Sequence, residues 1–125
     1  MPPMSLDPAA LVQRYLDTVV SGSAEDVAAL YAEDATLEDP VGGGEVHIGR
    51  QAIAGFYAMT ANAEVSTELL QLRTGGHEAA FAFAITVTMG DTKIRVEPIE
   101  VMNFNSAGEI TSMKAYWGPS DMKQL

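Results

Sequence analysis

The chain has 125 residues, no cysteine, and a net charge of −10 from 17 acidic and 7 basic residues. Its length fits one domain that buries roughly two thirds of its unfolded surface, which is enough for a core without disulfides. The acidic balance argues against nucleic acid and anionic membranes as partners, and the missing thiols exclude cysteine chemistry.

The N-terminal residues lack the basic region and the apolar run of a signal peptide. No stretch approaches the ~18 consecutive apolar residues that a membrane span needs. A chain without cysteine suits a reducing compartment, so we expect a cytoplasmic protein. We expect a single domain over residues 1–125, with its ordered core at about 7–118 and a dispensable tail after Pro119.

The first predicted helix begins at Asp7-Pro8, an N-cap followed by proline at the first helical position, and ends at Gly22. One half of its surface is apolar and the other half polar, so it is amphipathic. Its apolar half consists of Leu11, Val12, Tyr15, Leu16, Val19 and Val20.

Two further helices are predicted. A capping-box pattern at Ser23 and Asp26 opens a short helix that extends through Tyr31. The other helix covers residues 49–62 and has Phe56 and Tyr57 on its apolar side. The three helices thus each place one tyrosine on an inner face.

A short strand at residues 35–39 ends in a carboxylate. Alternation puts Asp39 on the same face as Leu37, and Pro40 holds Asp39 in an extended conformation before a glycine-rich turn. Partial loss of hydration is expected to raise the pKa of Asp39 above ~3.9, which makes it a candidate general base. The same residues are also typical of an ordinary Asp-Pro turn.

The remainder reads mostly as strands: a brief one at residues 45–48, then 66–74, 77–89, 92–104 and 110–117. Short glycine-containing connections make the consecutive long strands antiparallel hairpins. Helices followed by a meander indicate an α+β fold, in which a curved antiparallel sheet packed against about three N-terminal helices encloses an apolar pocket.

One charged residue interrupts an apolar row of the strand at 92–104. Glu100 shares parity with Val96, Pro98 and Met102, so we expect it to point inward. A carboxyl group there is costly unless it is paired or protonated. A bulge at Pro98 would reverse the parity downstream.

The predicted interior therefore holds two carboxylates, Asp39 and Glu100, and three tyrosines, Tyr15, Tyr31 and Tyr57. Taken singly, each tyrosine fits a core position in which its hydroxyl group has a partner. Taken together, a neutral carboxyl group and a tyrosine are two donors that can form an oxyanion hole, and an ionised aspartate supplies a base. This set suits proton abstraction next to a carbonyl group.

Other chemistries have little support in the sequence. His47 and His77 stand alone, and no metal-binding, phosphate-loop or serine-elbow motif is present, so we expect no metal site. Methionines 59, 89, 102 and 113 are expected to line the pocket or the core.

Several segments in this order resemble the bacterial Δ5-3-ketosteroid isomerases, from about Leu11 to Trp117. The matching segments are residues 12–15, 34–42, 56–57, 79–83, 98–100 and 103–105, of which Glu38-Asp39-Pro40-Val41-Gly42 is the most specific. The resemblance implies a cone-shaped fold of the nuclear transport factor 2-like (SnoaL-like) superfamily, a homodimer, a small hydrophobic steroid substrate and an enzyme that needs no cofactor.

The resemblance also implies roles for individual residues. Asp39 matches the base that moves a proton from steroid C4 to C6, and Tyr15 matches a donor to the C3 oxygen. Tyr31 and Tyr57 match tyrosines of a supporting hydrogen-bond network. The expected substrate-binding residues are Phe56, Phe81, Phe83, Met102, Met113 and Trp117.

The chain departs from the family at Glu100, where the second donor is an aspartic acid that the family keeps neutral. Glutamate is one methylene longer, and a misplacement of ~1 Å can cost ~100-fold in rate. The sequence therefore leaves open a weak isomerase, a related polyketide cyclase or epoxide hydrolase, and a protein that binds steroids or lipids without turnover.

Overall fold

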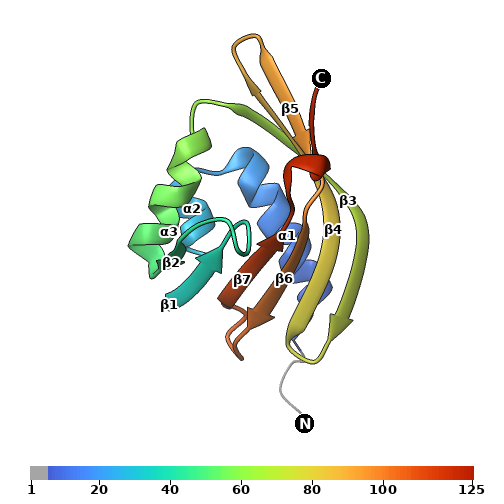
Figure 1. Cartoon of the computed structure of the whole chain (residues 1–125). Helices are drawn as coiled ribbons and strands as arrows, with labels where there is room; N and C mark the ends of the chain where they lie inside the picture. The colour runs from blue at the N-terminus through green and yellow to red at the C-terminus, as the bar shows by residue number, and fades with distance from the viewer. Residues whose placement is uncertain (1–5) are drawn as a thin grey trace.

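The computed structural model describes residues 6–125, which form three α-helices on one side of a strongly bent sheet (Figure 1). The helices are α1 (Pro8–Ser21), α2 (Ala24–Ala28) and α3 (Arg50–Tyr57), with 3₁₀ turns η1 (Ala58–Thr60) and η2 (Pro119–Asp121). The strands are β1 (Tyr31–Glu38), β2 (Val46–Ile48), β3 (Glu64–Gly75), β4 (Glu78–Met89), β5 (Thr92–Val96), β6 (Ile99–Phe104), β7 (Ile110–Tyr116) and β8 (Met122–Gln124). The α+β prediction is confirmed.

The predicted N-terminal caps are present. The Asp7 side chain accepts a hydrogen bond from the backbone N–H of Ala10, and Ser23 and Asp26 form a reciprocal capping box at α2. However, α2 ends at Ala28, and Tyr31 begins β1, so the expectation that Tyr31 lies on a helix is wrong. The pairing of Tyr31 with Ile110 of β7 gives this backbone a sheet partner, and that tertiary contact overrides local helix propensity.

The sheet is mixed, whereas the hairpin pattern predicted an antiparallel one. Its order is β2-β1-β7-β6-β4-β5-β8, with β3 on β4, and β1 runs parallel to β7. Short connections determine only how consecutive strands pair, so they contain no information about two strands as far apart as β1 and β7.

The predicted strand at 92–104 is divided into β5 and β6, which both pair with β4. Pro98 lies at the break because it has no backbone N–H to donate to a ladder. The parity nevertheless continues, since Val96, Pro98 and Glu100 all face the same cavity.

The C-terminal tail differs from expectation. It continues through η2 into β8, which pairs with β5, and the backbone N–H of Leu125 donates to the carbonyl oxygen of Lys93. The expectation that the first few residues are dispensable concerns residues 1–5, which lie outside the described residues. No helix within residues 6–125 has the length and apolarity needed to cross a bilayer.

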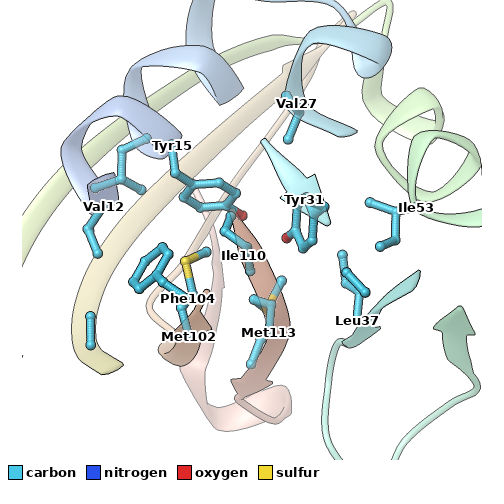
Figure 2. Packing of buried hydrophobic residues seen from close by; sticks show 14 of the residues in the cluster. Val12, Tyr15, Val27, Tyr31, Leu37, Ile53, Met102, Phe104, Ile110 and Met113 are labelled. Carbon is cyan, nitrogen blue, oxygen red and sulfur yellow. The ribbon is translucent and has the colours of Figure 1, made fainter. Parts of the chain in front are cut away.

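The core fills the space between the helices and the sheet (Figure 2). Its fully buried members come from α1, β1, α3, β4, β6 and β7; they include Val12, Leu16, Tyr31, Leu37, Ile53, Phe81, Met102, Ile110 and Met113. This packing closes one end of the sheet's inner face and leaves the other end hollow.

Candidate active site

A cavity of about 340 Å³ lies between α1, the end of α3 and the inner face of the sheet. Its polar side chains are Tyr15, Tyr57, Asp39, Glu100 and Thr60, together with the indole of Trp117. Aliphatic and aromatic side chains from β3, β4 and β5 form most of the remaining wall. A mainly apolar cavity with a few convergent polar groups is typical of a small-molecule site.

The three tyrosines are joined in one chain of hydrogen bonds. The Tyr57 hydroxyl lies 2.9 Å from the Tyr15 hydroxyl and 2.7 Å from the Tyr31 hydroxyl. Tyr15 and Tyr31 reach this point from α1 and β1, with their hydroxyl groups directed toward each other (Figure 2). Burial raises the pKa of all three well above the usual value, so the hydroxyl groups stay protonated and can donate.

Among the described residues, Glu100 is the only acidic or basic residue that is buried, with 2% of its surface exposed. It lies between Phe81 of β4 and Ala115 of β7 in the register of the sheet, and its side chain lines the cavity. Burial raises the pKa of Glu100 well above its usual value; the charge of Asp39 adds to this effect, and the Tyr15 hydroxyl opposes it. Its Oε1 atom is buried and has no hydrogen-bond partner within residues 6–125.

A raised pKa at Glu100 makes folding stability depend on pH. The folded state holds the proton at pH values where the unfolded chain, with a pKa near ~4.3, has lost it. Relative to Glu100→Gln, we therefore expect the free energy of unfolding of the wild type to fall as pH rises above ~4.3, by up to ~1.4 kcal/mol per pH unit. Denaturant unfolding of both proteins from pH 4 to 8 checks this, and parallel curves would contradict it.

Asp39 follows the end of β1 and is partly buried on the face it shares with the fully buried Leu37. The Trp117 indole N–H donates to Asp39 Oδ1 at 2.6 Å. Burial raises the pKa of Asp39, while the hydrogen bond from Trp117 and the charge of His47 lower it. Asp39 and Glu100 are thus two carboxyl groups on one cavity, and Glu100 has the larger upward pKa shift.

Trp117→Phe removes the indole donor and keeps an aromatic ring. A hydrogen bond to a charged group contributes about 1.5–3 kcal/mol, so its loss is expected to raise the pKa of Asp39 by about one to two units. If Asp39 must be ionised to act, the acid limb of any pH–rate profile shifts to higher pH by that amount. Tyr116→Phe, at the neighbouring exposed position, is the control; identical profiles for all three proteins would refute the coupling.

The sequence suggested that His47 stands alone, but in the structure it has close neighbours. It lies opposite Leu37 in the β1–β2 register and packs against Phe56, with ring centroids 5.2 Å apart. This position explains why its charge acts on the nearby Asp39. Within the described part of the chain, no three His, Asp or Glu side chains come together as a metal site.

The structure brings most of the predicted site residues to this cavity. Tyr15, Asp39, Phe56, Tyr57, Phe83, Glu100 and Trp117 line it, and Tyr31 lies behind them. Phe81, Met102 and Met113 instead lie in the core, each at most 1% exposed. The alternation of apolar and polar residues identifies the correct face of the sheet. However, the part of that face that holds Phe81, Met102 and Met113 is covered by the core and does not reach the cavity.

Sequence reasoning missed part of the wall. Val65, Ile85, Val87 and Val96 line the cavity, and the strand alternation that indicated Phe83 contained the signal for Ile85 and Val87. Met59 was expected in the pocket or core; it lines the cavity while 67% exposed, so it lies at the mouth. The role of Trp117 as a donor to Asp39 had no signal in the sequence.

Residues 12–113 match the model of the SnoaL-like domain family. The chain belongs to this family, which is the superfamily that the sequence resemblance indicated.

Within that family, a curated relative is the "Steroid Delta-isomerase" of Nocardioides simplex. It is 55% identical over 119 residues, which cover 95% of this chain and 96% of the relative. A similar solved structure is that of SalBIII, an epoxide hydrolase/cyclase-like enzyme with a role in pyran ring formation in polyether salinomycin; it has 29% identity and a TM-score of 0.87 over 94% of this chain and 95% of its own. RV0760c from Mycobacterium tuberculosis shares the fold, with 21% identity and a TM-score of 0.87 over 98% of this chain and 100% of its own.

Proposed function

We propose that this protein is a steroid Δ-isomerase, which moves the Δ5 double bond of a 3-ketosteroid into conjugation at Δ4. The observation that carries the proposal is the pair of carboxyl groups facing one apolar cavity, one partly buried beside an N–H donor and the other fully buried beside a tyrosine. The relative with 55% identity supports the same activity.

In the proposed reaction, the Asp39 carboxylate removes a proton from C4. The electrons of that C–H bond form a C3–C4 double bond, and the π electrons of the C3 carbonyl group move onto its oxygen. Tyr15 and protonated Glu100 donate hydrogen bonds to the resulting dienolate oxygen. Asp39 then returns the proton to C6, so the protein ends the cycle unchanged and needs no cofactor. The negative charge develops in a cavity whose wall is mainly apolar, where fixed donors have a large effect.

Tyr57 and Tyr31 support this arrangement without touching the reacting atoms. The Tyr57 hydroxyl forms hydrogen bonds with the hydroxyl groups of Tyr15 and Tyr31, and it thereby fixes the position of the Tyr15 hydroxyl. Its position therefore reduces the reorganisation that Tyr15 would need when charge develops on the substrate oxygen.

The assay follows absorbance of the conjugated enone formed from 5-androstene-3,17-dione. We expect turnover by the wild type and compare it with Glu100→Asp, which restores the family's residue. A large gain would show that the longer side chain holds the donor off its best position, and equal rates would show that the cavity adapts to it. Complete absence of turnover in both proteins would refute the proposed activity.

A purely binding role makes a different prediction. An isomerase site binds the enolate-like phenol equilenin in preference to a neutral steroid without a phenol, because its donors match an oxyanion. A carrier shows no such preference. Titration of both ligands therefore separates the two functions.

The epoxide hydrolase alternative has weaker support. Chemistry like that of limonene epoxide hydrolase needs a set of one arginine and two aspartates. Of the residues the structure describes, no arginine lines the cavity. Arg95 pairs with Glu68 and Glu97 on the surface, and Arg73 donates to the carbonyl oxygen of Leu72.

We also propose that the protein is a homodimer. Ile99 and Tyr116 lie opposite each other on β6 and β7, and both are about half exposed, at 51% and 46%. Large apolar side chains on an uncovered sheet face are typical of an interface. Sedimentation analysis tests this, with Ile99→Lys expected to shift the protein toward the monomer.

A further inference from the structure

His47 of β2 lies close to the proposed base. It is paired with Leu37 of β1 in the antiparallel register, so the two side chains lie on the same face of the sheet. Leu37 is fully buried on that face, and Asp39, two residues further along the chain, lines the cavity from it. His47 and Asp39 are therefore diagonal neighbours at the end of the β1–β2 ladder, a placement in which Cβ atoms lie about 7 Å apart.

The helix α3 covers this corner of the sheet. It packs against both β1 and β2 (Figure 1), and the ring of its Phe56 lies 5.2 Å from the ring of His47. The Phe56 ring also lines the cavity. His47 is thus partly buried between an aromatic side chain of the cavity wall and the proposed base, and a charge there is less screened than an exposed one.

The other polar groups around Asp39 carry little competing charge. The indole of Trp117, which donates to Asp39 Oδ1, is neutral at every accessible pH. Glu100 lies on the wall of the same cavity and is neutral in the proposed mechanism. Glu45, two residues before His47, is exposed, so water and salt screen its charge.

The other cations near this corner are directed elsewhere. Arg50, at the start of α3, donates to the Tyr31 carbonyl oxygen and pairs with Glu109. Lys114 lies opposite Glu38 in the β1–β7 register, on the other face of the sheet. Within the described residues, His47 is the one basic side chain whose charge lowers the pKa of Asp39.

We propose that His47 is a positioning residue that acts through Asp39: its imidazolium keeps the Asp39 carboxylate ionised in mildly acidic solution, and its neutral ring leaves Asp39 a stronger base in alkaline solution. The proposal rests on the proposed isomerase function, which makes Asp39 the base. Histidine ordinarily changes its charge between about pH 5 and 8. The positive charge is therefore present where a partly buried aspartate would otherwise take up a proton, so the base works over a wider range of pH.

His47→Gln removes the charge and keeps a polar side chain. Two charges about 7 Å apart in a partly buried site interact strongly enough to move the acid limb of kcat/KM for 5-androstene-3,17-dione up by about one pH unit, which is about a tenfold loss on that limb. At about pH 8.5, where the histidine is neutral, we expect the variant and the wild type to be equally fast. His77→Gln changes the other histidine, which is exposed in the β3–β4 turn, and should retain the wild-type profile.

His47→Lys keeps a positive charge at every pH of the assay. We expect its acid limb to stay at the position of the wild type, and its rate at about pH 8.5 to be about threefold lower, because Asp39 is then a weaker base. Loss of the packing on Phe56 alone would instead lower kcat/KM equally at every pH in both His47 variants, and that result would overturn the proposal. A His47→Gln profile identical to that of the wild type would also overturn it.

The ionisation of Asp39 is also measured without turnover, by ¹³C NMR of labelled aspartate carboxyl groups, with Asp39→Asn used to assign the signal. We expect its titration midpoint to rise by about one pH unit in His47→Gln and to stay unchanged in His77→Gln. This shift without turnover by the wild type would reject the isomerase alone. Normal turnover with an unchanged midpoint would reject the role of His47 alone.

Discussion

Asp39→Asn is expected to lower kcat about 10²–10⁴-fold, because it removes the proposed base and keeps the shape of the side chain. The amide can still accept the hydrogen bond from Trp117, so the local geometry should persist. Affinity for a conjugated product steroid should change little, since the apolar wall is intact. Stopped-flow or steady-state enone absorbance measures the rate.

The control for Asp39→Asn is Glu38→Gln, at the preceding position, where alternation directs the side chain to the other face of β1. It removes one charge at a neighbouring site and should leave kcat within a factor of about two, the range typical of a surface change. An Asp39→Asn protein that isomerises steroid as fast as the wild type would refute the assignment of the base.

Tyr15→Phe is expected to lower kcat about 10²–10³-fold, because it removes one of two donors to the oxyanion. Tyr57→Phe keeps the Tyr15 hydroxyl but breaks both hydrogen bonds of the network, so its loss should be smaller. Equal losses in the two variants would show that the network, and not a direct bond from Tyr15, is responsible. Thermal unfolding of both proteins checks that the fold is intact.

The pH dependence of the rate provides a further check on the same assignment. Because burial raises the pKa of Asp39, kcat/KM should fall as pH drops through that raised value, where the base becomes protonated. The acid limb should therefore lie above the usual range for an aspartate. This limb should disappear in Asp39→Asn, whose residual rate no longer depends on that group.

Much of the site could be predicted because alternation and helical periodicity act locally. Parity alone placed Asp39 with Leu37 and Glu100 with Met102, and both carboxyl groups face the interior in the structure. The prediction of a cone-shaped fold, in contrast, depended on the resemblance to a known family. The α+β architecture followed from the order of the elements.

The differences between the expectations and the structure have a common origin in contacts between distant segments. Tyr31 lies on a strand because Ile110, far along the chain, pairs with it. The tail forms β8 because β5 has a free edge. Phe81, Met102 and Met113 are core residues because the helices cover their part of the sheet. None of these contacts has a signature within a short window of sequence.

The proposed mechanism requires that Glu100 is a neutral acid while Asp39 is an anion in the same cavity. Infrared difference spectroscopy of the wild type against Glu100→Gln at pH 7 tests it most directly, since protonated and ionised carboxyl groups absorb at different frequencies. We expect the substitution to remove a protonated carboxylic acid band and no carboxylate band. Loss of a carboxylate band instead would show that Glu100 is ionised and would contradict the proposed site.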